Sequence, residues 1–73
     1  MNDTHTTSIA VTGMTCGHCV ASVTEELTEL AGVTAVDVDL HPGEASDVTI
    51  TSTSPLDPVA VEAAVAEAGY ALR

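Results

Sequence analysis

The sequence predicts an α+β fold in which two helices cover one face of a four-stranded antiparallel sheet. Three observations predict it. Short stretches with alternating apolar residues mark strands, two longer stretches carry apolar residues at helical spacing, and the elements follow in the order strand, helix, strand, strand, helix, strand. The chain has 73 residues, which suffice for one small domain and leave no room for a second.

The first strand is predicted over residues 6–12, where Ile9 and Val11 point to the same face. A short loop then leads to a helix predicted over residues 17–31, because apolar residues recur there at intervals of three and four positions. Gly32 is well placed as the C-terminal cap of this helix. The apolar residues of the predicted buried stripe are Val20, Val23, Leu27 and Leu30.

Two further strands are predicted over residues 35–40 and 47–51, where Val, Leu and Ile alternate with Asp and Thr. Residues 41–44, His-Pro-Gly-Glu, separate them and are typical of a turn. Because this turn is short, we expect the two strands to run antiparallel to each other.

The second helix is predicted to begin at Asp57 and Pro58, since a carboxylate can cap free backbone amides and proline suits the first helical position. Gly69 ends this helix, and residues 70–72 form a short fourth strand. Its predicted buried stripe consists of Val61, Ala64, Val65 and Ala68. The order βαββαβ is that of the ferredoxin-like sandwich, with both helices on one face of the sheet.

The charge balance excludes two classes of partner. The sequence has 11 Asp and Glu residues against one basic residue, Arg73, for a formal net charge of -10. Nucleic acids and anionic membranes are bound through Lys and Arg, so neither is expected as a partner. A partner protein would instead offer a basic docking face.

The N-terminus does not have the pattern of a targeting segment. Residues 1–5 are predicted to be a flexible tail and residues 6–73 the folded domain. No basic stretch precedes an apolar one, as in a signal peptide, and no apolar run approaches the roughly 18 residues of a membrane span. We therefore expect a cytoplasmic protein without membrane insertion. In a reducing cytoplasm, a close pair of cysteines indicates metal binding or redox chemistry.

Both cysteines lie in the segment Gly-Met-Thr-Cys-Gly-His-Cys, residues 13–19, with Cys16 in the loop and Cys19 in the first helical turn. The partial positive charge of a helix N-terminus favours thiolates, and two thiolates suit a soft ion such as Cu(I). A structural zinc site would need four ligands. His5 and His41 are predicted in the tail and in a turn at the opposite end of the sheet, which disfavours zinc. A metal-transfer module and a thiol oxidoreductase remain as alternatives.

The segment Gly13-Met14-Thr15-Cys16-x-x-Cys19 after a short strand, with Gly32-Val33 and Gly69-Tyr70 after the two helices, resembles the heavy-metal-associated domain. This resemblance covers about residues 6–72. The family comprises bacterial CopZ-like copper chaperones and the N-terminal metal-binding domains of copper-transporting P-type ATPases. A Met at position 1 favours the free chaperone, whereas the very short last strand slightly favours a domain excised from a transporter.

The resemblance implies roles for individual residues. Cys16 and Cys19 would be the two Cu(I) ligands, and Met14 would pack beneath the loop without binding metal. Thr15 stands where zinc exporters of the family often have an acidic residue, and this favours Cu(I). Tyr70 falls where bacterial members have a tyrosine near the metal loop. The helix dipole and the loop amides, aided by this hydroxyl, would offset the negative charge of the copper site, because no Lys or Arg is expected nearby. Alternatively, Tyr70 is a partly buried aromatic residue that closes the edge of the sheet.

His18 lies between the two cysteines and faces solvent in this prediction. An exposed histidine here would be a bystander or would tune the acidity of the thiols. It could also supply a third ligand if two chains shared copper in a dimer; otherwise we expect a monomer.

The oxidoreductase alternative depends on Cys-Gly-His-Cys, which is also the active-site tetrapeptide of protein disulfide isomerases. Those enzymes resemble thioredoxin, which has about a hundred residues, an aromatic residue before the first cysteine and a proline facing the pair. Here Thr15 precedes Cys16, and the three prolines fall in turns or at a helix start. The sequence thus favours a non-enzymatic Cu(I) chaperone that delivers copper by thiolate exchange to a copper-transporting ATPase, to its metal-binding domain or to a regulator.

Overall fold

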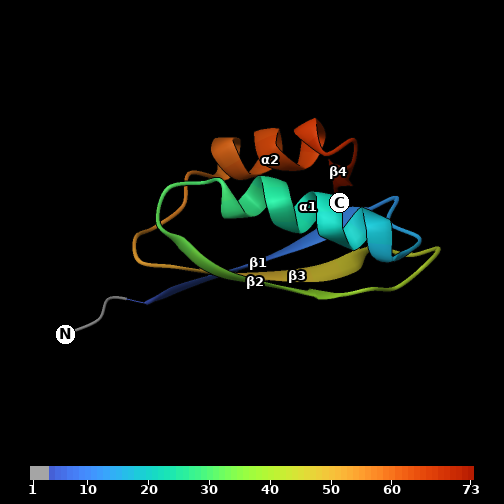
Figure 1. Ribbon diagram of the computed structural model, residues 1–73, viewed down its shortest axis with the longest axis horizontal. Helices are drawn as coiled ribbons and strands as arrows, with labels where there is room; N and C mark the ends of the chain where they lie inside the picture. The colour runs from blue at the N-terminus through green and yellow to red at the C-terminus, as the bar shows by residue number, and fades with distance from the viewer. Residues whose placement is uncertain (1–3) are drawn as a thin grey trace.

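The computed structural model describes residues 4–73 (Figure 1). Its elements are β1 (His5–Thr12), α1 (Gly17–Thr28), β2 (Val33–Asp39), β3 (Ser46–Ser52), α2 (Pro58–Glu67) and β4 (Ala71–Leu72). Residues 1–3 of the predicted tail lie outside the described residues, and its last residue, His5, begins β1.

The four strands form one antiparallel sheet in the order β2-β3-β1-β4. Both helices lie on the same face of this sheet (Figure 1). The fold is therefore the ferredoxin-like sandwich that the sequence predicts. Within the part of the chain described, neither helix has the length and apolar character needed to span a membrane.

Several element boundaries differ from the predicted ones, most by a single residue, and the two largest differences are at the end of α1 and the start of β2. α1 ends at Thr28, earlier than expected, because the N–H groups of Glu29 and Leu30 donate to carbonyls three residues back, at 3.3 and 3.1 Å. Bonds of this spacing tighten the last turn and end the helix. β2 begins at Val33, also earlier than expected. Its register with β3 shifts between Val33 and Ala35, and this irregularity breaks the alternation on which the strand prediction depends.

The hydrophobic core lies between the sheet and the two helices, and no aromatic side chain is part of its fully buried set. The predicted helical stripes contribute to it, with Leu30 and Ala68 half-buried against it, but Val20 is not among the residues packed on the core, and Cys19 of the same turn is. Each buried aliphatic side chain contributes about 1.5–3 kcal/mol relative to an exposed one. The buried apolar residues are Val11, Met14, Val23, Leu27, Val48, Ile50, Val61, Ala64 and Val65.

The predicted start of α2 is confirmed. The carboxylate of Asp57 accepts a hydrogen bond from the backbone N–H of Val59 at 2.9 Å, and Pro58 occupies the first turn. This cap fixes where α2 begins. The helix then returns the chain to β4, which pairs with the end of β1.

The antiparallel pairing of β1 with β3 brings two connections to the same end of the sheet. Val11, near the end of β1, lies opposite Ser46, the first residue of β3. The loop after β1 and the turn between β2 and β3 are therefore neighbours (Figure 1). The prediction that His41 lies at the opposite end from the cysteines is wrong, because it did not take this pairing into account.

Candidate metal site

The loop from β1 to α1 is anchored on both sides. Gly13 has a φ of +92°, in the left-handed region that other residues rarely adopt. A Cβ atom at this glycine would lie 3.4 Å from the Cδ1 atom of Tyr70, so the tyrosine ring packs over the turn. Met14, the next residue, has no exposed surface and belongs to the core. The segment that carries the two cysteines, residues 13–19, is called the thiol loop below.

The two thiols meet at the N-terminus of α1. Cys16 is the N-cap residue, and its carbonyl accepts hydrogen bonds from the N–H groups of Cys19 and Val20, at 3.1 and 3.3 Å. Cys16 is exposed and Cys19 is half-buried, and both are free cysteines. Their sulfur atoms are 3.6 Å apart, well beyond the roughly 2.05 Å of a disulfide bond. Two reduced sulfurs therefore face each other at an exposed position.

The surroundings of Cys19 favour its thiolate. Hydrogen bonds from the backbone of Thr15, from the hydroxyl of Tyr70 and from the backbone of Cys16 lower the pKa of Cys19 to about 6, against a smaller opposing effect of burial. The hydroxyl of Thr15 lies 4.0 Å from the same sulfur. At neutral pH, Cys19 is therefore ready to bind a metal ion without first losing a proton.

Tyr70 is the second residue whose ionisation the thiol loop changes. Its hydrogen bond to Cys19 is the largest of the effects that raise the pKa of Tyr70, followed by burial and by the negative charges of Cys19 and Cys16. The hydroxyl therefore keeps its proton and donates it toward the sulfur of Cys19. Tyr70, in the segment between α2 and β4, thus contacts the thiol loop, as the family resemblance implies.

A cavity of about 490 Å³ separates the thiol loop from the turn between β2 and β3. It is lined by Thr12, Gly13, Met14, Thr15, Gly43, Glu44, Ala45 and Arg73. Arg73, the one basic residue, borders this cavity, but neither cysteine does, and Arg73 is not among the groups that shift the pKa of Cys19. Arg73 is 58 positions from Thr15 in the sequence, but its N–H donates to the carbonyl of Ala10 at 2.8 Å and extends the pairing of β4 with β1. This pairing brings Arg73 to the cavity.

The three histidines are not gathered around the thiols. His18 is exposed in the first turn of α1, between the two cysteines. His5 begins β1 and lies opposite Ser52, at the far end of the sheet. His41 is at the same end as the thiols, but its imidazole is held by Asp39 and Asp47.

Sequence reasoning missed the group formed by Asp39, His41 and Asp47, called the hairpin cluster below. One ligand atom from each residue lies within 4.8 Å of the others. A usable signal was present: Asp39 and Asp47 are equally far from Gly43 in the turn, and antiparallel strands bring such positions together.

Comparisons with known proteins find relatives over most of the chain. A COP-associated protein of Helicobacter felis is 39% identical to the chain over 64 residues, which are 88% of this chain and 92% of that protein. Copper-transporting ATPase 2 of Homo sapiens is 35% identical over 65 residues, which are 89% of this chain and 4% of that much longer protein. Among solved structures, a CopZ metallochaperone with 30% sequence identity superposes with a TM-score of 0.80 and covers 94% of this chain and 100% of its own.

The family comparison covers most of the chain, including the thiol loop and both helices. Residues 8–71 match the family described as the heavy-metal-associated domain. The match includes Cys16 and Cys19 and ends just after Tyr70, which packs on the loop. This chain belongs to the heavy-metal-associated domain family.

Proposed function

We propose that the protein is a copper chaperone that binds one Cu(I) ion between Cys16 and Cys19 and passes it to a partner protein. The observation that carries this proposal is the pair of free sulfurs, 3.6 Å apart at an exposed helix N-terminus. The lowered pKa of Cys19 supports it, because a thiolate is the form that binds metal. The names of the similar proteins, a CopZ metallochaperone and a copper-transporting ATPase, support copper as the ion.

The ligand set favours Cu(I) over Zn(II). Thiolates are soft ligands that select Cu(I), whereas a structural zinc ion takes four ligands in a tetrahedron. Thr15, beside Cys16, brings a hydroxyl and no carboxylate to the loop. His5 is at the far end of the sheet and cannot complete a zinc site with the thiols. Copper bound by two sulfurs would remain open to a third ligand from outside.

We propose that transfer occurs by thiolate exchange at this open position. A thiolate of the partner forms a third copper–sulfur bond, after which one bond to Cys16 or Cys19 breaks. A second exchange releases the ion with its charge unchanged, and no electron is lost or gained. Cys16 is the more exposed of the two sulfurs and is the first to be displaced. No covalent bond of a substrate is made or broken, so the proposed function is not enzymatic.

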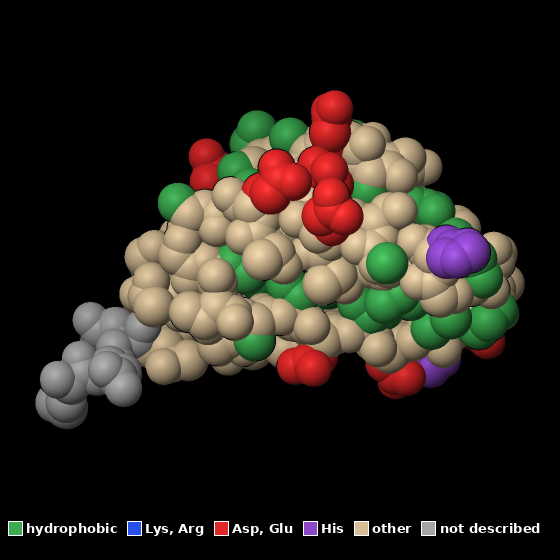
Figure 2. All heavy atoms as spheres, in the orientation of Figure 1, with side chains coloured by type: hydrophobic (Ala, Val, Ile, Leu, Met, Phe, Trp, Pro, Cys, Tyr) green, Lys and Arg blue, Asp and Glu red, His purple; other side chains and the backbone are tan. Residues whose placement is uncertain are grey.

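The acidic surface supports a partner with a basic docking face. Acidic side chains gather over the helical layer (Figure 2). Burial, followed by the charges of Glu29, Glu67 and Glu25, raises the pKa of Glu26, so α1 and α2 contribute to one negative region. We propose a metal-binding domain of a copper-transporting ATPase as the partner. Charge attraction speeds association and is screened by salt.

Transfer to such a domain should therefore slow as the ionic strength rises. The measurement is stopped-flow transfer from the copper-loaded chain to the isolated acceptor domain, in increasing NaCl. Matched variants are Glu26→Gln, within the acidic region, and Glu44→Gln, in the turn between β2 and β3. A smaller salt dependence in Glu26→Gln than in Glu44→Gln supports docking through the helices. Rates indifferent to salt would remove the electrostatic part of the proposal.

Thiol oxidoreductase activity is the alternative, and the structure offers little for it. The prolines lie in the turn between β2 and β3, in the loop before α2 and at the first position of α2. The family match is to a metal-binding domain. We propose that the protein works in the cytoplasm, where a reducing environment keeps a thiol pair available for metal.

The decisive experiment is metal competition on the reduced protein. Cu(I) is titrated against a chromophoric chelator and the titration is repeated with Zn(II), using the wild type, Cys16→Ser, Cys19→Ser and the control His18→Ala. We expect one tightly bound Cu(I) per chain, loss of tight binding in both cysteine variants, and retention in His18→Ala. Weak Cu(I) binding together with a disulfide that exchanges readily with other thiols would favour the oxidoreductase instead. A copper-bridged dimer that involves His18 would appear as a larger species in sedimentation, abolished by His18→Ala.

A further inference from the structure

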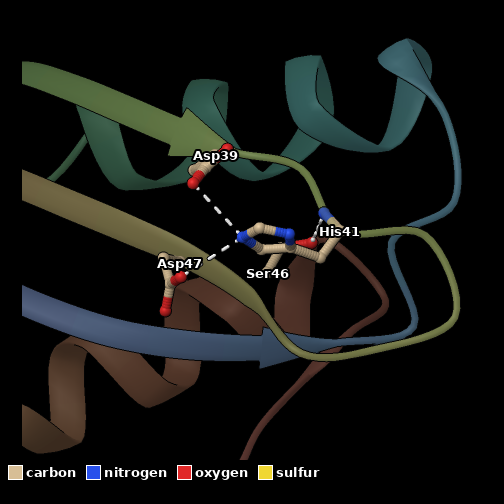
Figure 3. A network of polar contacts seen from close by, with 4 residues as sticks. All are labelled: Asp39, His41, Ser46 and Asp47. Carbon is tan, nitrogen blue, oxygen red and sulfur yellow. Dashed lines mark hydrogen bonds and ion pairs between the residues drawn. The ribbon is translucent and has the colours of Figure 1, made fainter.

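The hairpin cluster lies where β2 ends and β3 begins (Figure 3), and neither cysteine belongs to it. The Nε2 atom of His41 is 3.2 Å from an Oδ2 of Asp39 and 3.3 Å from an Oδ2 of Asp47. All three side chains are accessible: His41 is 40% exposed, Asp39 75% and Asp47 71%. One imidazole nitrogen and two carboxylate oxygens therefore converge at a position that solvent can reach.

The strand register holds the two carboxylates together. Asp39 and Asp47 are direct partners in the β2–β3 ladder, on the face of the sheet away from the helices. Two like charges directly opposite each other on neighbouring strands destabilise a sheet. The net charge of -10 adds to the cost of this pair. A cation between the two carboxylates would remove that repulsion.

A hydrogen bond also fixes the backbone at His41. The N–H of His41 donates to the hydroxyl of Ser46 at 2.9 Å, and Ser46 is completely buried at the start of β3. His41 thus leaves β2 in a defined direction and turns back over the two aspartates (Figure 3). The ligand atoms come together before any ion binds, and less conformational entropy is lost on binding.

The distances leave room for a metal ion. Charge-assisted hydrogen bonds are usually about 2.7–2.9 Å long, and both distances here are longer. Two ligand atoms that each lie about 2.1 Å from a tetrahedral zinc ion are about 3.4 Å apart, close to the separations of 3.2 and 3.3 Å. All three ligand atoms lie within 4.8 Å of one another, so small movements of the exposed carboxylates bring them to one ion.

We propose that Asp39, His41 and Asp47 form a second metal site, which takes a divalent cation of the Zn(II) class through one nitrogen and two oxygens. Imidazole with carboxylates suits zinc and its neighbours in the transition series, whereas Cu(I) prefers the sulfurs of the thiol loop. Water fills the remaining coordination position, because the cluster is open to solvent. The bound ion links the ends of β2 and β3 across the solvent face of the sheet.

The test is calorimetric titration of Zn(II) into the full chain carrying Cys16→Ser and Cys19→Ser, so that no thiol competes for zinc. Circular dichroism first checks that this variant is folded. We expect saturable binding of one Zn(II) per chain and a higher unfolding temperature with zinc. We expect His41→Ala, Asp39→Asn or Asp47→Asn, each added to this variant, to weaken zinc binding by more than about tenfold. Groups that only hydrogen-bond to a metal ligand already cost about tenfold or more when they are removed, and direct ligands should cost at least as much.

The matched control is Asp37→Asn. Asp37 lies in the same strand and on the same face as Asp39, but opposite Thr49 rather than Asp47. This control should leave zinc binding unchanged. Equal losses in Asp37→Asn and Asp39→Asn would mean that zinc only gathers near a negative surface, and the proposal would be overturned. Absence of saturable binding in the double cysteine variant would overturn it too.

A second measurement uses the wild type and needs no substitution. Mn(II) prefers oxygen and nitrogen ligands and broadens NMR signals of nearby nuclei. We expect Mn(II) to broaden the amide signals of residues 39–47 first, at concentrations that leave those of α2 sharp. Broadening spread evenly over the acidic residues of the chain would contradict a defined site.

Discussion

The thiol loop and the hairpin cluster lie at the same end of the sheet but are built in different ways. The two cysteines are three positions apart, and the start of one helix brings their sulfurs within 3.6 Å. Asp39 and Asp47 are eight positions apart, and the register of two strands brings them together. The first site is a local feature of the sequence, whereas the second depends on how strands pair.

The two sites also differ in what supports them from below. The thiol loop rests on Met14, which is completely buried, and Tyr70 packs against it from α2 and β4. The hairpin cluster lies on the solvent face of the sheet, and its one buried support is Ser46. Damage to the core should therefore affect the thiols more than the cluster. The next two predictions test this difference, beginning with the larger effect.

We expect Met14→Ala to destabilise the protein by about 2–5 kcal/mol, because it removes a completely buried side chain and leaves a cavity beneath the thiol loop. Urea unfolding of the metal-free, reduced protein measures the loss. Val59→Ala is the control: Val59 is 70% exposed on α2, and its truncation should change stability by no more than about 0.5 kcal/mol.

The same variant separates the two sites. At a temperature where Met14→Ala is still folded, we expect weaker Cu(I) binding to the thiol loop. Zn(II) binding to the hairpin cluster, measured in chains with both cysteines replaced by serine, should be unchanged. Equal weakening of metal binding at both sites would mean that both depend on the same part of the core. That result would contradict the proposed difference in their structural support.

How far the sequence predicted each site follows from this difference. The alternating strands, the helical stripes and the Asp57 cap are local patterns, and the structure agrees with them apart from Val20 and from shifts at element ends, largest at the end of α1 and the start of β2. The nearness of the two sulfurs follows from their spacing at a helix start. The position of His41 was mispredicted, because it depends on which strands pair and in which register, and the place of Arg73 beside the cavity depends on the same kind of pairing. Tyr70 near the loop was expected only through the family resemblance.

A smaller effect than that of Met14→Ala is expected on the pKa of Cys19. The hydroxyl of Tyr70 donates a hydrogen bond to this thiol and helps to lower its pKa to about 6. Tyr70→Phe removes this donor and keeps the ring that packs on Gly13. We expect the pKa of Cys19 to rise toward the ordinary value of about 8.5 without reaching it, because the backbone of Thr15 contributes the largest part of the shift.

Alkylation by iodoacetamide as a function of pH, in metal-free Cys16→Ser protein, measures this change because the thiolate is the reactive form. With Tyr70 present, the rate should rise through a midpoint near pH 6 and then level off. With Phe at position 70, the midpoint should move to higher pH, so that less thiolate is present at neutral pH.

Copper capture should become more dependent on pH in the same direction, since the metal then has to displace a proton. Zinc binding to the hairpin cluster should not change, because the hydroxyl removed here has Cys19 as its partner and none of the three cluster residues. A midpoint that stays near 6 in Tyr70→Phe would assign the whole shift to the backbone, and the thiol loop would then owe its acidity to local structure only.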